Sequence, residues 1–352
     1  NSVPFPNVQI FDGAGSLRFG TEASSTFNYL KQSTYNLSDQ FKYTTGKHTF
    51  IAGFEAEYYK AFNSFIQNTT GSYQYDNVAA FLADTKPRSY FVGFPLLGDN
   101  NERTTDAAAK FSVFRGSLFL GDDIKVNSAL SFTVGIRADY TKFLTTPISD
   151  PFAIDSALPK FAQYYNLEGA VPGKAGKIPL SISPRVGFTY KIPEEGITIR
   201  GGIGLFSGRI PMVWPGGIYN NNGISSGSYT LNTSTNTAIW NQDKIRFRTT
   251  PYSPTEVGVS VKNVKGQLNL MSETFKASKV MRSSLAIDKN MGSGWTLTFE
   301  GMYTKNINDI YYQNVNLLPP TLKSTGPDSR NVYGTLTSAS NTIPIRSNGT
   351  NP

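Results

Sequence analysis

The sequence predicts an all-β protein, an antiparallel transmembrane β-barrel segment of about eight strands. Three observations predict this fold class. Apolar and polar residues alternate in successive long stretches, short and long connections alternate between those stretches, and the composition suits strands and turns. The 352 residues are 13% aromatic and only 16% charged, with 32 Gly and 20 Pro. We expect residues 1–352 to be part of a single barrel domain.

Each expected strand has two unlike faces. In the stretch that follows Thr49, Phe54 shares a face with other apolar residues, whereas Glu55 and Glu57 lie on the opposite face. The same alternation is present in residues 49–62, 130–143, 181–192, 197–206 and 295–306. A period of two residues is typical of β-strands that separate two environments. The whole set of strands is expected to begin near Thr34 and to end near Tyr312.

The apolar face is expected to contact lipid and the polar face to line a wet interior, because a lipid-facing surface tolerates charged side chains poorly. The predicted lipid-facing set is Phe54, Phe132, Val134, Phe188, Ile203 and Phe299. The predicted inward set is Glu55, Arg137, Arg185 and Arg200. The alternative is a soluble β-sandwich with one core face and one solvated face. The strand length and the pattern of connections favour the barrel.

The connections alternate in length along the chain. The short ones are rich in turn residues and span Thr44–His48, Lys125–Ala129, Pro193–Gly196 and Asn290–Gly294. The long ones span roughly residues 67–107, 144–180 and 210–279, with another after Asn316. Short periplasmic turns and long extracellular loops are typical of outer-membrane barrels. We therefore expect the chain to lie in the outer membrane of a Gram-negative bacterium, with membrane lipid as a partner.

A glycine-rich stretch, residues 199–209, could be a phosphate-binding loop or part of a strand. A dinucleotide fingerprint needs a third glycine where Ser207 stands, and it needs a following helix. Pro211 and Pro215 are expected to exclude that helix. We therefore place Gly202 and Gly204 inside a strand, where a missing side chain leaves room for a neighbouring backbone.

The composition excludes several chemistries. The chain has no Cys and a single His, His48, which argues against thiolate chemistry, most zinc sites and a catalytic triad. The net charge of +8 is scattered along the chain, so we expect no nucleic-acid partner. Asp122 and Asp123 are expected to be solvated charges at a periplasmic strand end. We expect no enzyme activity, no catalytic residues, no cofactor and no metal site.

Particular hairpins carry a family resemblance. Residues 117–140, SLFLGDDIKVNSALSFTVGIRADY, resemble a hairpin of TonB-dependent outer-membrane receptors. In that family one strand ends in two acids, an aromatic residue and a lysine, and the next ends in Gly-x-Arg-x-Asp. The matching residues are Asp122, Asp123 and Lys125, with Ile124 in the usual aromatic place, then Gly135, Arg137, Asp139 and Tyr140. Residues 183–211 and 281–317 resemble the hairpins that follow. The Oar-like branch is most similar, and SusC-like receptors are the nearest competitor.

The resemblance implies a function and a larger molecule. Members of the family have barrels of roughly twenty-two strands, so this chain would supply about eight of them. The plug, the TonB box, an N-terminal domain and the remaining strands are expected outside this chain. The implied function is transport of a bulky substrate across the outer membrane, driven through TonB. A peptide, a protein or a glycan is the candidate substrate, and a surface lipoprotein is a candidate further partner. The alternative is a non-transporting receptor or a structural barrel subunit of a surface complex.

The long connection after Ile210 is the candidate ligand-binding loop. It combines aromatic residues with many Asn and Ser residues, and rigid aromatic rings beside adaptable amides are typical of binding loops. The candidate ligand-binding residues are Trp214, Tyr219, Tyr229 and Trp240. The alternative is that these rings only pack the loops against one another above the barrel.

Overall fold

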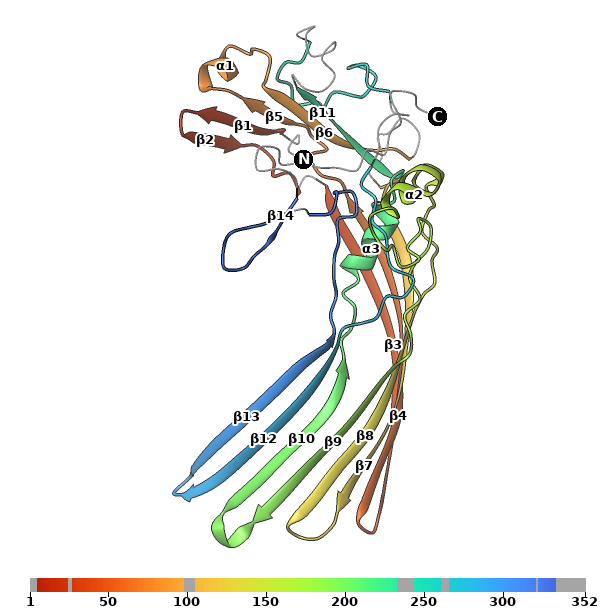
Figure 1. The fold of residues 1–352 in the computed structure, drawn as a ribbon, viewed down its shortest axis with the longest axis vertical. Helices are drawn as coiled ribbons and strands as arrows, with labels where there is room; N and C mark the ends of the chain where they lie inside the picture. The colour runs from red at the N-terminus through yellow and green to blue at the C-terminus, as the bar shows by residue number, and fades with distance from the viewer. Residues whose placement is uncertain are drawn as a thin grey trace.

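The computed structural model describes residues 5–24, 27–97, 105–232, 244–260, 266–320 and 322–333. Its largest part is an eight-stranded antiparallel sheet with the order β13-β12-β10-β9-β8-β7-β4-β3. In chain order its strands are β3 (Asn28–Thr45), β4 (His48–Phe65), β7 (Ala109–Lys125), β8 (Leu130–Phe143), β9 (Ser181–Ile192), β10 (Ile197–Ser207), β12 (Lys279–Gly292) and β13 (Trp295–Asn308). The sheet is curved and open, with β3 and β13 at its edges (Figure 1). The predicted fold class is confirmed.

The four short turns lie together at one end of this sheet (Figure 1). A tight reversal needs left-handed backbone conformations, which glycine adopts without steric cost. Gly46 has φ 53° in the first turn, and Gly196 has φ 59° after the 3-10 turn η3 (Pro193–Glu195). Ser293 and Gly294 have φ 52° and 83° in the last turn. Each predicted short connection therefore closes a hairpin.

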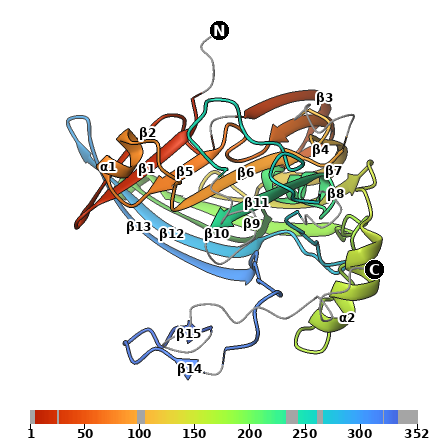
Figure 2. The same cartoon turned by 90° about the horizontal axis from the view of Figure 1, so that it is seen from above.

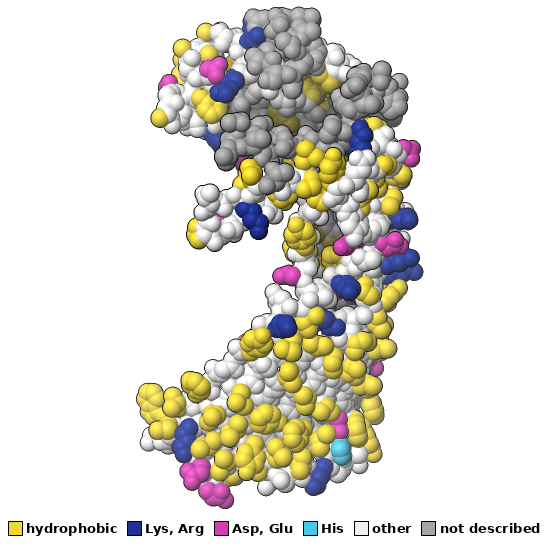
Figure 3. Space-filling model, viewed as in Figure 1, with side chains coloured by type: hydrophobic (Ala, Val, Ile, Leu, Met, Phe, Trp, Pro, Cys, Tyr) yellow, Lys and Arg dark blue, Asp and Glu magenta, His cyan; other side chains and the backbone are white. Residues whose placement is uncertain are grey.

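The two faces of the sheet differ as the alternation predicts. We call the face against which helix α3 (Val213–Asn220) packs the inner face, and the opposite face the outer face. Phe54 opposes Leu118 across the strands, and Leu118 opposes Ala138, so the outer face is apolar from strand to strand. Figure 3 shows hydrophobic side chains spread over the lower half of the molecule, where these strands lie. The exposed fractions of Phe54 and Phe299 are 36% and 77%.

A second sheet lies across the other end of the strands (Figure 2). Its order is β11-β6-β5-β1-β2, and β1 and β5 are parallel. Its strands are β1 (Asn7–Asp12), β2 (Gly15–Phe19), β5 (Ser72–Tyr75), β6 (Ser89–Pro95) and β11 (Ser226–Asn232). Tyr73, Tyr90 and Leu231 are fully buried in its core. β5, β6 and β11 fall in the connections 67–107 and 210–279, which were expected to be long loops, and instead they form strands of a folded cap.

Smaller elements complete the described part of the chain. They are helix α1 (Val78–Leu82), the π-helical turn η2 (Ala153–Ala157), helix α2 (Leu158–Phe161) and the short strands β14 (Leu322–Lys323) and β15 (Asn331–Val332). Leu158 and Phe161 are buried in a local cluster together with Ala153 and Ala157. In the described residues, no helix is both long enough and apolar enough to cross a membrane.

The helix α3 corrects one expectation from the sequence. Pro211 and Pro215 were expected to exclude a helix here, yet α3 begins at Val213 and contains Pro215. Pro215 is the third residue of the helix, where its backbone nitrogen needs no intrahelical partner. The two prolines therefore set the start of the helix rather than prevent it.

The glycine-rich strand matches the strand interpretation. A Cβ atom at Gly202 would lie 2.8 Å from the carbonyl oxygen of Val186, and one at Gly201 would lie 2.7 Å from that of Ser284. Real Cβ atoms are not found at such distances from a backbone oxygen. The glycines in β10 thus allow close approach of β9 and β12.

Candidate functional site

The inner face carries a network of charged side chains below the cap. We call it the inner ion-pair network; its members are Glu55, Glu57, Arg115, Arg137, Asp139 and Arg209. It forms because alternate residues of neighbouring strands share a face, and the register sets Glu57 directly opposite Arg115. The three guanidinium groups and three carboxylates balance one another in charge.

Short contacts hold the inner ion-pair network together. Nη1 of Arg115 lies 2.8 Å from Oε1 of Glu57, and Nη2 of Arg137 lies 2.6 Å from Oε2 of Glu55. Nε of Arg137 also lies 2.8 Å from Oδ1 of Asp139. Charge-assisted hydrogen bonds of this kind are the strongest that side chains make. They fix β4, β7 and β8 relative to one another on the inner side.

Arg209 links this wall to the loop that follows β10. Nη1 of Arg209 lies 3.1 Å from Oε2 of Glu57, and Arg115 donates a hydrogen bond of 2.9 Å to the carbonyl oxygen of Ile210. The side chain of Arg209 remains 68% exposed and that of Glu55 42% exposed, whereas that of Glu57 is only 11% exposed. The network therefore exposes one cation, Arg209, and one anion, Glu55, on the inner side.

Nearer the turns, the inner face is polar as well. Nε of Arg200 lies 2.8 Å from Oδ2 of Asp288, and Thr298 donates a hydrogen bond of 2.8 Å to the same carboxylate. Arg137 and Glu55 lie on the inner face, as predicted, and so does Arg200. Arg185 also lies on the inner face, as predicted. It opposes Gly204 of β10, and Gly204 lies on the same face as Arg200. A polar wall of this kind can hydrogen-bond a hydrophilic solute or a second protein element.

Trp214 is the most accessible of the three predicted ligand-binding residues that the structure describes. Its side chain lies in the first turn of α3 and is 43% exposed. Its ring meets that of Tyr312 edge to face, with centroids 5.7 Å apart. Tyr312 was not predicted as a site residue, because it lies beyond the last strand and nothing in the sequence connects it with residue 214.

Tyr219 and Tyr229 are both buried, in different parts of the molecule. Tyr219 stacks on Phe111 at 4.6 Å and donates a hydrogen bond of 2.8 Å to the carbonyl oxygen of Thr145. Tyr229 lies in the core of the second sheet and donates a hydrogen bond of 2.7 Å to the carbonyl oxygen of Tyr252. Burial raises the pKa of both hydroxyl groups above the usual range. Both rings pack the protein itself, and the structure does not bring them together with Trp214.

Trp240 lies outside the described residues. Ligand contact by the four predicted residues remains a prediction, and the exposures favour Trp214. Within the described ranges, no group of three or more His, Asp or Glu residues could hold a metal ion.

An arginine at the edge of the cap orders the segment 244–260. Nη2 of Arg248 lies 2.9 Å from Oε2 of Glu256, and its guanidinium lies 3.6 Å from the ring centre of Tyr252. The backbone nitrogen of Ser253 donates a further hydrogen bond of 2.7 Å to Glu256. The hydrogen bond from Arg248 is the main cause that lowers the pKa of Glu256 to about 2.

Asp122 differs from its expected role as a solvated charge. It lies on the outer face, where its Oδ2 is 2.6 Å from Nδ1 of His48, and its side chain is only 14% exposed. His48 begins β4 and stacks on Phe50, with ring centroids 5.4 Å apart. Asp123 points to the inner side and accepts a hydrogen bond from Thr133. The neighbouring acids thus face opposite sides of the sheet, as strand alternation requires.

Comparison with known proteins identifies the family. The outer membrane beta barrel domain family matches residues 1–351. The chain belongs to this family. It therefore lies in the outer membrane of a Gram-negative bacterium and contacts membrane lipid. In barrels of this class the short turns face the periplasm and the long connections face the outside.

Solved structures show only a distant likeness. The chain is 13% identical to the outer membrane transporter YddB from Escherichia coli, with a TM-score of 0.39 over 82% of this chain and 27% of that one. It is 12% identical to the siderophore receptor PirA from Pseudomonas aeruginosa, with a TM-score of 0.38 over 90% of this chain and 38% of that one. The chain thus spans well under half the length of either protein. No curated protein matched the chain.

Proposed function

We propose that this chain is part of the barrel of a TonB-dependent outer-membrane transporter that moves a bulky substrate across the outer membrane. The observation that carries the proposal is the inner ion-pair network, which gives a membrane-embedded sheet a polar wall directly below a folded extracellular cap. A wet interior with exposed charges suits the passage or docking of polar material, and a structural sheet alone has no need for it. The hairpin motifs around Arg137 and Asp139 resemble those of the Oar-like branch.

The proposed substrate is a peptide, a protein or a glycan, captured first at the cap. Trp214 supports capture because its aromatic ring is exposed on a helix that packs on the inner face. The proposed partners are TonB, through parts of the protein outside this chain, and a surface lipoprotein. We further propose that the domain has no enzyme activity, since its single histidine, His48, is engaged by Asp122 on the lipid-facing side.

Uptake by whole cells tests the proposal. Cells that produce the full-length protein are given fluorescent peptides, proteins and glycans, and the label inside the outer membrane is measured with and without TonB. Accumulation that requires the protein, TonB and an energised inner membrane supports a transporter. Binding at the surface with no accumulation in any of these cells would instead indicate a non-transporting receptor. Absence of both, in a correctly assembled protein, would indicate a structural subunit.

A further inference from the structure

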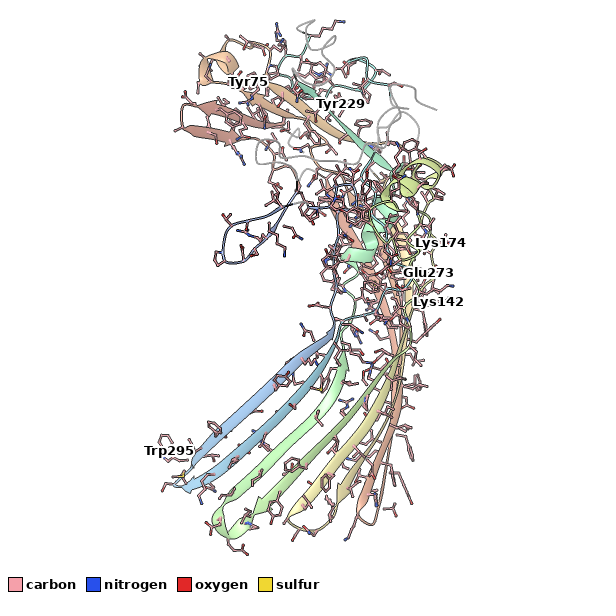
Figure 4. All side chains as sticks on the ribbon, in the orientation of Figure 1. Tyr75, Lys142, Lys174, Tyr229, Glu273 and Trp295 are labelled. Atoms are coloured by element: carbon pink, nitrogen blue, oxygen red, sulfur yellow. The ribbon has the colours of Figure 1, made fainter. Side chains whose placement is uncertain are left out.

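Four lysines lie together on the outer face at the extracellular end of the large sheet. We call them the outer lysine group: Lys31 in β3, Lys60 in β4, Lys110 in β7 and Lys142 in β8. Lys60 follows Phe54 by six residues in the same strand, so it shares the lipid-facing side. All four side chains are exposed. Figure 4 labels Lys142 near the middle of the molecule, below Lys174 and Glu273.

The strand register keeps three of the four lysines close together, and the fourth, Lys142, lies opposite Phe114 on the next strand. Phe62 is the direct neighbour of both Lys31 and Lys110, and Ser112 is the direct neighbour of Lys60. Lys31 and Lys60 are thus diagonal neighbours on one face, and so are Lys60 and Lys110, at roughly 7–8 Å between backbone positions. Flexible four-carbon stems let such neighbours converge on one anion.

An aromatic belt lies immediately below Lys31, Lys60 and Lys110, and Lys142 lies at its level. The ring centroids of Tyr35 and Tyr58 are 6.2 Å apart, and Tyr58 donates a hydrogen bond of 3.0 Å to the hydroxyl oxygen of Ser112. Phe114 occupies the same row and opposes Lys142 in β8. Tyrosines of this kind mark the boundary between hydrocarbon and headgroups. The lysines therefore lie at the level of the lipid headgroups of the outer leaflet.

No carboxylate of the described residues neutralises the outer lysine group. None of its four ammonium groups forms an ion pair within the described ranges. On the outer face, Asp39 lies eight residues below Lys31 along β3, which is about 26 Å. Glu273, which Figure 4 places above Lys142, is paired with Lys177 at 3.6 Å. Four neighbouring cations without a protein counter-charge raise the local positive potential and attract anions.

We propose that the outer lysine group binds the phosphate groups of a phosphorylated lipid headgroup in the outer leaflet. The four ammonium groups pair with the phosphates, while the belt of Tyr35, Tyr58 and Phe114 contacts the upper part of the acyl chains. A free anion lacks the chains that this belt would contact. The proposal depends on the membrane location of the sheet and not on transport.

A titration of the full-length protein in detergent with bisphosphorylated lipid A tests this proposal. Replacing all four lysines by Gln should weaken binding about 600-fold, since each basic residue near an anionic surface contributes about fivefold and independent contributions multiply. The Arg variant, K31R/K60R/K110R/K142R, should bind as the unchanged protein does. A matched control removes the same number of charges at the turn end of the strands, through K42Q/K125Q/K191Q/K289Q, and should bind normally.

Each outcome decides for or against the site. Wild-type affinity in the Gln variant, or equal affinity for dephosphorylated lipid A, would overturn the proposal. Displacement of the lipid by millimolar inorganic phosphate would indicate a site for free anions instead. Heat-modifiable electrophoretic mobility shows whether each variant is folded, and a folded Arg variant that fails to bind would also count against the proposal.

Discussion

Trp214 and Tyr219 lie on the same short helix, yet their environments are opposite. Tyr219 is 5% exposed and fills the space against Phe111, whereas Trp214 is 43% exposed in the first turn. A buried ring that is already hydrogen-bonded cannot also contact a ligand without a rearrangement of the helix that carries it. An exposed ring on an ordered helix loses little conformational entropy on binding. Both residues were predicted to bind ligand from their residue types, and only their different burial in the structure separates their roles.

Replacing Trp214 by Ala should weaken capture of the transported substrate by about 1 kcal/mol, or roughly fivefold in Kd. Assembly of the barrel should be unaffected, because Trp214 lies outside the strands and contacts mainly Tyr312. Binding to the full-length protein checks this. Trp295 is the matched control: it is 75% exposed at the turn end of β13 (Figure 4), so W295A should bind normally. Equal affinity in both variants would mean that Trp214 only packs against Tyr312.

The segment 244–260 shows how a loop without regular structure is held on the cap. Tyr73 donates a hydrogen bond to the carbonyl oxygen of Arg248, and the hydroxyl oxygen of Tyr90 accepts one from the backbone nitrogen of Tyr252. These bonds satisfy backbone groups that a strand or helix would otherwise satisfy. Arg248 and Glu256 close the segment on itself with two hydrogen bonds.

The order of this segment should depend on pH. The folded-state pKa of Glu256 is lowered from 4.5 to about 2, so its contribution to stability is complete above pH 4.5. That contribution decreases as the pH falls from 4.5 and is lost below about 2. It amounts to about 1 kcal/mol or less, because the side chains of Glu256 and Arg248 are 48% and 33% exposed. The protection factors of the amides in residues 244–260, which correct for the intrinsic pH dependence of hydrogen exchange, should therefore be steady between pH 7 and 5 and lower at pH 3.

The variant E256Q provides the control for this prediction. It removes the carboxylate and keeps the shape of the side chain, so the protection factors of the segment should be lower at pH 7 and show no further change between pH 5 and 3. The same pH response in E256Q as in the unchanged protein would assign the effect to another group.

The strands of the barrel segment could be predicted from the sequence, whereas the cap could not. Residues 130–143 alternate between apolar and polar because the outer face contacts lipid and the inner face contacts water. Every second residue therefore faces the same environment. The cap strands pair across long distances: β6 pairs with β11, more than 130 residues later. Short strands such as β5, with four residues, are too brief for a periodicity to be recognised. Their aromatic residues therefore suggested a binding loop.

The candidate site could be predicted only in part, because it also depends on pairing between strands that are distant in sequence. Glu55 and Arg137 were placed inward by alternation, but their pairing depends on register between strands that are distant in sequence. Arg209 lies just after β10, outside any alternating stretch, so only the fold shows that it meets Glu57. The outer lysine group is likewise a product of register across four strands.

At the scale of the whole molecule, the large sheet has two open edges. β3 has 18 residues and β13 has 14, and both lie at the ends of the strand order. Along each edge, alternate backbone groups point away from the sheet with no neighbouring strand in the described residues. In the hydrocarbon core each unsatisfied group costs several kcal/mol, because no water is present to replace the missing partner.

Residues 1–352 produced alone should therefore not insert into bilayers as a stable, heat-resistant monomer. The cap could still fold, since its core around Tyr73 and Tyr90 is independent of lipid. The measurement is electrophoretic mobility before and after boiling, after refolding into phospholipid vesicles, with the full-length protein as the control. The full-length protein should show the compact, heat-modifiable band, because further strands would pair with β3 and β13. A heat-resistant monomer formed by residues 1–352 alone would show that these two edges close on each other, and the domain would then be a small complete barrel.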